Sequence, residues 1–318
     1  MNFQQLRSVR ETVRQGFNLT AVADTLHTSQ PGVSRQIKEL EDELGVSLFR
    51  RSGRRFLGLT PPGEVALPII ERLLLEADNL KRVGDEFAAC DAGTLAVAAT
   101  HTQARYALPT AVRDFRDQHT QVALHLQQGS PRQIAEWVLK GQADLGVATE
   151  ALADYPDLVT LPCYRWTHVV VVPPEHPLAQ AQARGEALTL EALARHPLVT
   201  YEPGYTGRSH IDEAFQRAGL RFEVVLSAMD ADVIKTYVDL GIGVGVVASV
   251  AIDDARDRHL VAIDAGHLFA LNTTRVAVKR GAYLRSYVLD FIQTFAPTLT
   301  PEVVLAAMDS PPGTVIDL

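Results

Sequence analysis

Residues 28–64, TSQPGVSRQIKELEDELGVSLFRRSGRRFLGLTPPGE, decide the fold of the N-terminal end of the chain. Ser29 is placed to cap a helix, Pro31 falls in its first turn, where a missing N–H costs nothing, and Gly45 follows its last apolar residue. The apolar residues of this segment share a 4-3-4 spacing that gathers them on one face: Val33, Ile37, Leu40 and Leu44. We therefore expect a helix over residues 30–44 with one face in a hydrophobic core.

The opposite face of this helix carries polar groups that suit DNA. The major groove admits a helix, and amide and guanidinium groups pair bidentately with adenine and guanine, so Gln30, Ser34 and Arg35 are candidates for reading base edges. Lys38 is placed to meet phosphate. Apolar residues at helical spacing predict two shorter helices upstream: Phe3, Leu6, Val9 and Val13 in the first, and Leu19, Val22, Ala23 and Leu26 in the second. The second and third helices, joined by a tight turn, are typical of a helix-turn-helix.

Residues 46–59 alternate apolar and basic side chains around the turn signal Ser52-Gly53, which predicts a short β-ribbon. Beside a reading helix, such a ribbon would form a wing that adds affinity through phosphate contacts. Its arginines crowd into six positions: Arg50, Arg51, Arg54 and Arg55. From these residues alone, an ordinary helical bundle with a solvated polar face and a basic loop remains an alternative.

Over its whole length the quoted stretch resembles the winged helix-turn-helix of the LysR-type transcriptional regulators, with the serine, proline, arginine and LF-R positions all matching. The resemblance implies that Gln30, Pro31, Ser34 and Arg35 lie next to the bases. We therefore expect a DNA-binding domain over residues 1–59, whose contacts with double-stranded promoter DNA come from Ser29, Gln30, Pro31, Ser34, Arg35, Lys38, Arg50, Arg51, Arg54 and Arg55.

Residues 60–90 predict a long linker helix. Thr60-Pro61-Pro62-Gly63-Glu64 combines an N-cap, a proline at the first helical position and an acid expected to complete a capping box. Pro68 lies inside this helix, where proline costs about 3 kcal/mol, so a kink or a later helix start is allowed. The apolar residues approximate a heptad seam that favours dimerisation through a second copy of the helix: Ala66, Ile69, Ile70, Leu73, Ala77, Leu80 and Phe87. The alternative is a lone helix packed on its own domain.

From residue 91 onward, segments with strand and helix patterns alternate, which indicates an α/β domain with crossovers over residues 91–300. Its length accommodates two lobes. We place lobe I at about residues 91–164 and 269–300 and lobe II at about residues 165–268, followed by a C-terminal tail at residues 301–318. The expected fold class is therefore mixed: a winged helix-turn-helix, a linker helix and a two-lobed α/β domain.

Hydroxyl and amide side chains gather where the predicted strands of this domain end or its helices begin. Ligands of α/β folds bind at the carboxyl ends of strands, next to helix N-termini that present free N–H groups. Neutral donors in that position suit a small anion or an amino-acid-sized ligand. The alternative is that each hydroxyl merely caps its helix. The candidate effector-binding residues are Thr100, Thr102, Gln103, Ser130, Thr149 and Thr206.

Motifs along the whole domain, among them THTQARYALP, QGSPRQIAEWV and DADVIKTYVDLGIGVGVVAS, resemble the CysB/Cbl group of LysR-type regulators. The resemblance implies a periplasmic-binding-protein-like domain and a transcriptional activator of cysteine biosynthesis and of sulfate or sulfonate assimilation. It also implies RNA polymerase as a partner, homodimers or homotetramers, and an effector such as sulfate, O-acetylserine, N-acetylserine or adenosine phosphosulfate. Glu202-Pro203 departs from the group's pattern near Thr206, and an added carboxylate there would weaken anion binding. A regulator of a different metabolic operon is the other reading.

The charge distribution and the sequence motifs bear on three classes of protein: DNA-binding proteins, enzymes and solute-binding proteins. The net charge of −8 is unevenly spread, and residues 1–60 hold nine Arg or Lys against six Asp or Glu, so the basic end is the one expected to meet DNA.

Gly241, Gly243 and Gly245 follow a helical pattern and precede a strand, opposite to the order of a dinucleotide loop. The sequence contains neither HExxH, GxSxG nor a Walker motif, so we expect no enzyme, no metal site and no cofactor. A solute-binding protein is disfavoured by the basic head and the lack of a signal-like N-terminus, which also indicates the cytoplasm and no membrane partner. Cys90 and Cys163 are expected to be buried thiols.

Overall fold

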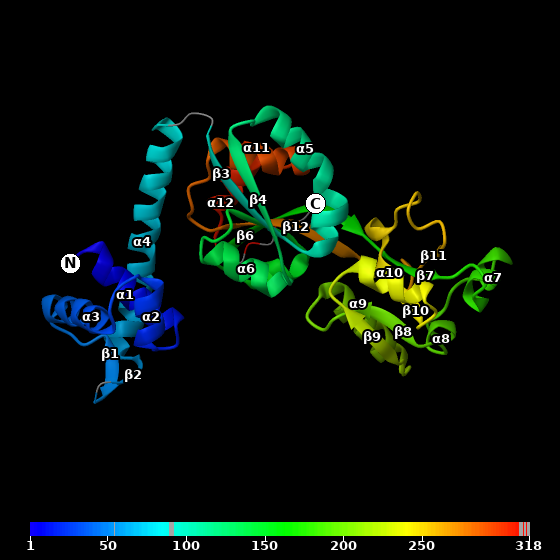
Figure 1. Ribbon diagram of the computed structural model, residues 1–318, viewed down its shortest axis with the longest axis horizontal. Helices are drawn as coiled ribbons and strands as arrows, with labels where there is room; N and C mark the ends of the chain where they lie inside the picture. Colours follow the sequence, from blue (N-terminus) through cyan, green and yellow to red (C-terminus); the bar gives the residue numbers. More distant parts are fainter. Residues whose placement is uncertain (54, 89–91, 312–313, 315, 317–318) are drawn as a thin grey trace. The chain divides into compact units, whose positions relative to one another are not determined.

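The computed structural model describes residues 1–53, 55–88, 92–311, 314 and 316 (Figure 1). The chain divides into two compact units, Met1–Ala88 and Ala89–Leu318. Among the described residues, no helix combines the length and the apolar character needed to cross a lipid bilayer.

The first unit is a three-helix core followed by a two-stranded ribbon and a long helix. Its elements are α1 (Phe3–Arg14), α2 (Leu19–Thr25), α3 (Gln30–Leu44), β1 (Phe49–Ser52), β2 (Arg55–Leu59) and α4 (Pro61–Ala88). The predicted boundaries of α3 are confirmed, because the Ser29 hydroxyl accepts the Gly32 N–H at 3.2 Å and Gly45 ends the helix in the left-handed conformation with φ of 70°. Val33, Ile37 and Leu40 are fully buried in the core of the unit.

Two residues of the predicted apolar stripes face solvent instead. Leu44 is 45% exposed and Phe3 is 53% exposed. Phe3 is the first residue of α1 and Leu44 is the last residue of α3, so both lie beyond the edge of the small hydrophobic core. The predicted helical periodicity is therefore confirmed, but the buried face of each helix is shorter than the sequence predicts.

The wing is anchored to α3 by a buried carboxylate. Glu41, near the end of α3, accepts the N–H groups of Leu48 at 2.7 Å and Phe49 at 3.1 Å and pairs with the Arg51 guanidinium. That guanidinium also lies 4.5 Å from the centre of the Phe56 ring, which packs edge-to-face on Phe49 at 4.9 Å. A buried charge is costly to leave without its partners, so the Glu41 carboxylate fixes the position of β1 relative to α3.

Helix α4 runs unbroken through Pro68 from a start at Pro61. The Thr60 hydroxyl accepts the Gly63 N–H at 3.1 Å, which makes Gly63 the third helical residue. Glu64 is therefore one position too late for the capping box expected from the sequence. Pro68 is tolerated because it faces solvent near the N-terminal end of the helix.

The apolar residues of α4 divide between two faces. Ile70, predicted in the seam for a partner helix, is 4% exposed and packs with Leu74 into the core of its own unit. Five large apolar residues of the same helix are exposed instead: Val65, Ile69, Leu73, Leu80 and Phe87.

The second unit consists of two lobes, each built on a five-stranded sheet (Figure 1). Lobe I has the strand order β4-β3-β5-β12-β6, and lobe II has the order β11-β7-β10-β8-β9. The strands of lobe I are β3 (Gly93–Ala99), β4 (Val122–Gln128), β5 (Leu145–Ala148), β6 (Leu158–Trp166) and β12 (Asn272–Lys279). The strands of lobe II are β7 (His168–Val172), β8 (Leu198–Tyr201), β9 (Val224–Ala228), β10 (Val244–Ala248) and β11 (Val261–Asp264).

Helices cover both faces of each sheet, as the alternating pattern predicts. In lobe I they are η1 (Gln103–Ala107, a π-helical turn), α5 (Leu108–Gln118), α6 (Pro131–Leu139), η2 (Glu150–Asp154), α11 (Ser286–Phe295) and α12 (Pro301–Met308). In lobe II they are α7 (Pro177–Ala183), α8 (Leu190–Leu193), α9 (Thr206–Ala218), α10 (Ala231–Asp239) and η3 (Ser249–Ala251). The chain passes from β6 directly into β7 and returns from lobe II into β12, so two short crossings join the lobes.

The structure extends lobe I beyond residue 300, where the sequence suggests only a tail. Val304 and Ala307 of α12 are buried in the same core as the α5 and α11 side chains. Further on, Arg275 of β12 donates to the Ile316 carbonyl at 3.0 Å. Residues 301–318 therefore include part of the domain core, which short motifs could not reveal.

Gly63 provides a test of how α4 is seated. A Cβ at this position would overlap the Leu48 carbonyl oxygen, whereas a Cβ at Gly84 on the same helix meets nothing within 4 Å. We expect Gly63→Ala to destabilise the first unit by about 1–3 kcal/mol, the usual cost of overpacking. Gly84→Ala should stabilise it by up to about 1 kcal/mol through helix propensity.

Denaturation of the full chain separates the two units, because both tryptophans, Trp137 and Trp166, belong to the second unit. Gly63→Ala should lower the denaturation midpoint of the first unit, which is seen by far-ultraviolet circular dichroism. The midpoint seen by tryptophan fluorescence should not change. Equal effects of the two alanine substitutions on the circular dichroism transition would contradict the close approach of α4 to Leu48.

Candidate functional site

The polar face of α3 lies open to solvent. Gln30, Pro31, Arg35 and Lys38 are exposed, and Ser34 is half-buried. Arg35 has an 81% exposed side chain, whose Nε lies 2.8 Å from a Glu39 carboxylate oxygen. Hydrogen bonding to Arg35 lowers the pKa of Glu39. An exposed pair of this kind is weak, so the guanidinium can leave Glu39 for a base edge at little cost.

The arginines of the wing differ in how freely they can reach DNA. Arg50 and Arg55 are exposed on β1 and β2, while Arg51 is engaged by Glu41 and the Phe56 ring. Arg54 lies outside the described residues. Charge alone predicts Arg51 among the phosphate contacts; in the structure its guanidinium pairs with Glu41 and helps to position the wing. The feature of the sequence that could have indicated this pairing is Glu41, an acidic residue ten positions before Arg51 on the helix that precedes the wing.

A small cavity lies in the second unit between lobe I and lobe II. Its volume is about 30 Å³. The lining residues come from strand ends and helix starts of both lobes: Thr100, Thr102, Gln103, Pro131, Thr149, Trp166, Tyr201, Tyr205, Thr206 and Gly207. We call this cavity with its lining the cleft. Five of the six predicted effector residues meet there, although they are spread over more than 100 positions of the sequence.

Ser130 is the predicted effector residue that the structure leaves out of the lining. Its hydroxyl accepts the Gln133 N–H at 3.3 Å and the Gln133 side chain reaches back to the Ser130 N–H at 2.9 Å, a complete capping box. Its neighbour Pro131 lines the cleft instead. For Ser130, capping was therefore the better interpretation of the sequence.

Gln103 reaches the cleft, but its amide serves lobe I. The side chain is 1% exposed, its Nε2 donates to the Thr274 hydroxyl at 3.0 Å and its Oε1 accepts the Tyr164 hydroxyl at 2.6 Å. Gln103 thus fixes the π-helical turn at the edge of the cleft, and its side chain is not a spare donor.

Three kinds of neutral donor face the cleft. The hydroxyls of Thr149, after β5, and Thr206, in the first turn of α9, are hydrogen-bonded to each other at 2.5 Å, so one of their two protons remains for a ligand. Tyr205 caps α9 without a side-chain hydrogen bond, so the first N–H groups of that helix are left for a ligand. The indole nitrogen of Trp166, a residue that is 7% exposed, has no hydrogen-bond partner in the described part of the chain.

Sequence reasoning missed Trp166, Tyr201 and Tyr205. Trp166 ends β6 and Tyr201 ends β8, so both occupy the strand-end position that was used to select the threonines. An aromatic residue at the end of a strand fits a hydrophobic core equally well, so the residue type alone does not indicate a ligand site. Burial raises the pKa of Tyr201 to about 12, so its phenol stays neutral.

None of the ten lining residues carries a formal charge. Glu202, whose carboxylate was expected to disturb the site, is exposed and lies outside the lining. His168, directly behind Gly207, is fully buried, and burial lowers its pKa to about 4, so it is neutral as well. The cleft therefore offers dipoles without a neutralising cation, an arrangement that suits a small dehydrated anion.

His101, next to the cleft, is hydrogen-bonded to Gln128 at 3.0 Å and to Asp232 at 3.3 Å. Gly241 ends α10 with φ of 76°, before β10 begins, which confirms the helix-to-strand order of the glycine run. Cys163 is only partly buried, but burial raises the pKa of its thiol to about 12; Cys90 lies outside the described residues.

Comparison with known proteins gives two family matches that follow the division of the chain. Residues 3–64 match the bacterial regulatory helix-turn-helix protein of the lysR family, and residues 89–300 match the LysR substrate binding domain. The HTH-type transcriptional regulator SsuR of Burkholderia cenocepacia is 59% identical over 94% of this chain and 96% of its own length. The HTH-type transcriptional regulator CysB of the same organism is 53% identical over 97% of both chains.

Among solved structures, the cofactor-binding domain of the Cbl transcriptional regulator aligns with a TM-score of 0.65 at 45% identity. The alignment covers 69% of this chain and 95% of that domain. The winged head, the two-lobed domain and both family matches lead to one conclusion: the chain belongs to the LysR family of bacterial helix-turn-helix transcriptional regulators.

Proposed function

We propose that this regulator holds a small anion of sulfur metabolism in the cleft and that the occupied cleft changes how α3 and the wing grip promoter DNA. The observation that carries the effector assignment is the lining of hydroxyl, indole and helix N-terminal donors without a charged side chain. The names of the relatives, SsuR, CysB and Cbl, support genes of cysteine biosynthesis and of sulfate or sulfonate assimilation as the regulated set.

Sulfate is the effector that the cleft fits best. A volume of about 30 Å³ corresponds to about two water positions. Sulfate is compact, and the unprotonated dianion needs donors only, which is what the lining supplies. O-acetylserine, N-acetylserine and adenosine phosphosulfate are larger and would require the lobes to move apart.

Self-association would be mediated by α4. Leu80 and Phe87 are 74% and 79% exposed, on the side of the helix that the core of its own unit does not cover. A second copy of α4 would bury these side chains and set two reading helices against a dyad-related site. We propose a homodimer as the minimal unit and pairs of dimers, as homotetramers, on longer promoter sites, acting mainly as an activator that recruits RNA polymerase.

Arg35 tests the reading face. Arg35→Ala should weaken binding to a sulfate-assimilation promoter fragment by about 1–3 kcal/mol and leave binding to random DNA nearly unchanged, because a base contact carries specificity. Fluorescence anisotropy with both fragments at one salt concentration measures the difference. Equal losses on the two DNAs would show that Arg35 contacts phosphate.

Arg55 tests the wing. Arg55→Ala should weaken binding to promoter and random DNA alike, and the slope of log affinity against log salt should become shallower by about one. Arg55 is exposed on β2, so its loss should not disturb the fold. An unchanged salt slope would place the wing away from the DNA backbone.

Thr102 tests the cleft. Thr102→Val keeps the shape of the side chain, removes its hydroxyl and adds no charge, so it should abolish the rise in melting temperature that sulfate gives the wild-type chain. Ser130→Ala is the matched control: it removes a hydroxyl outside the cleft and should keep the full sulfate response despite the loss of a cap. A normal sulfate response in Thr102→Val would move the site elsewhere.

A further inference from the structure

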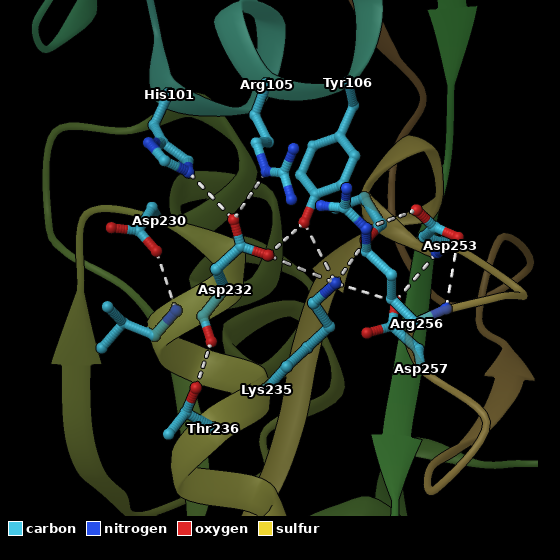
Figure 2. Close-up of polar contacts among 12 residues, drawn as sticks. His101, Arg105, Tyr106, Asp230, Asp232, Lys235, Thr236, Asp253, Arg256 and Asp257 are labelled. Atoms are coloured by element: carbon cyan, nitrogen blue, oxygen red, sulfur yellow. Dashed lines mark hydrogen bonds and ion pairs between the residues drawn. The ribbon is translucent and has the colours of Figure 1, made fainter.

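A network of polar side chains joins lobe I to lobe II beside the cleft (Figure 2). Its centre is Asp232, in the first turn of α10 in lobe II. The Tyr106 hydroxyl donates to one Asp232 oxygen at 2.5 Å, while His101 Nε2 and Arg105 Nε lie 3.3 and 3.4 Å from the other. These three residues all belong to the segment of lobe I that follows β3.

Lys235 extends the network into the interior of lobe II. It is 5% exposed, and its ammonium group donates to the Tyr106 hydroxyl at 3.0 Å, the Asp257 carboxylate at 2.8 Å and the Ala251 carbonyl at 2.8 Å. The Tyr106 ring packs against the apolar core of lobe II, with Lys235 Nζ 5.2 Å from its centre. Tyr106 is thus a lobe I side chain whose hydroxyl is hydrogen-bonded to two lobe II residues, Asp232 and Lys235.

The element that carries Tyr106 also borders the cleft. The π-helical turn η1 spans Gln103–Ala107; Gln103, together with the preceding Thr102, lines the cleft, while Arg105 and Tyr106 contact α10. Single π-turns inside helices occur frequently at functional sites. Movement of lobe II relative to lobe I must therefore break the contacts of Asp232 or shift the turn that borders the cleft.

A cation site is a poorer explanation of this cluster. Ligating atoms of His101, Asp230 and Asp232 lie within 4.8 Å of one another. Asp230, however, caps α10 by accepting the Val233 N–H at 2.8 Å, and Asp232 already faces the cationic groups of Arg105 and Lys235. A metal ion would compete with both positive charges.

We propose that Asp232, Tyr106 and Lys235, with His101 and Arg105, form an interlobe clamp that holds the lobes closed over the cleft and so sets how tightly the cleft retains a sulfate-sized anion. The affinity part of this proposal rests on the proposed function. If the anion binds the closed lobes, its apparent dissociation constant rises as the closed fraction falls. Weakening the clamp should therefore raise the dissociation constant for sulfate without touching a lining residue.

The test compares Asp232→Asn with Asp230→Asn in the full-length chain. Both remove one negative charge from the start of α10, and asparagine still caps a helix at position 230, but only the change at 232 disrupts contacts to lobe I. Tyr106→Phe is a second variant, which keeps the ring in the lobe II core and removes only the shared hydroxyl.

Hydrogen exchange read by mass spectrometry reports the clamp without any ligand. The amides of residues 103–107 and of the first turn of α10 should exchange faster in Asp232→Asn and Tyr106→Phe than in the wild type and Asp230→Asn. Calorimetric titration with inorganic sulfate should show a dissociation constant raised at least about fivefold in the same two variants. Indistinguishable exchange in Asp232→Asn and Asp230→Asn, or faster exchange with unchanged sulfate affinity, would overturn the proposal.

The two hypotheses fail in different ways. If the wild-type chain takes up no sulfate, the proposed effector is wrong, and exchange alone then decides the clamp: faster exchange in Asp232→Asn than in Asp230→Asn supports it, and equal exchange overturns it. If both asparagine variants lose sulfate affinity equally, the cause is the lost charge and the clamp is wrong.

Discussion

The property on which the second unit depends is the meeting of its two lobes around one uncharged cleft. Thr149 from lobe I and Thr206 from lobe II bring their hydroxyl oxygens within 2.5 Å, and the remaining lining adds an indole and the first turn of α9. Without a cation to neutralise it, an anion held there must be stabilised by dipoles arranged from both sides. The strength of that arrangement depends on the spacing of the lobes, which makes the site sensitive to their closure.

The interlobe clamp is a second set of contacts between the lobes, in addition to those of the cleft. The charged groups of the interlobe clamp lie next to the cleft and outside its lining, so the energy of closing need not come from the ligand alone. A ligand shifts such an equilibrium only by its differential affinity for the two states, and modest selectivity for the closed state is sufficient. The turn shared by cleft and clamp lets a small change at one reach the other.

Helix caps and apolar periodicity predicted the elements of the structure because both are local properties. Ser29, Pro31 and Gly45 defined α3, and the positions of strand ends brought five effector candidates to one cleft. The same local reasoning could not tell a hydroxyl that faces a ligand from one that caps its helix, as at Ser130, or an arginine that faces solvent from one bound to Glu41, as at Arg51. Nor could it foresee the clamp, because Tyr106 and Asp232 are 126 positions apart and belong to two separate motifs that do not show that the two side chains meet.

The most direct test of the account is a nuclease footprint of the full-length protein on a sulfate-assimilation promoter, with and without sulfate and against excess random DNA. The account predicts specific protection whose length or pattern of enhanced cleavage changes when sulfate is added, because the cleft and the reading heads belong to one switch. Protection that random DNA removes as easily as promoter DNA, or a footprint that sulfate leaves identical, would contradict it.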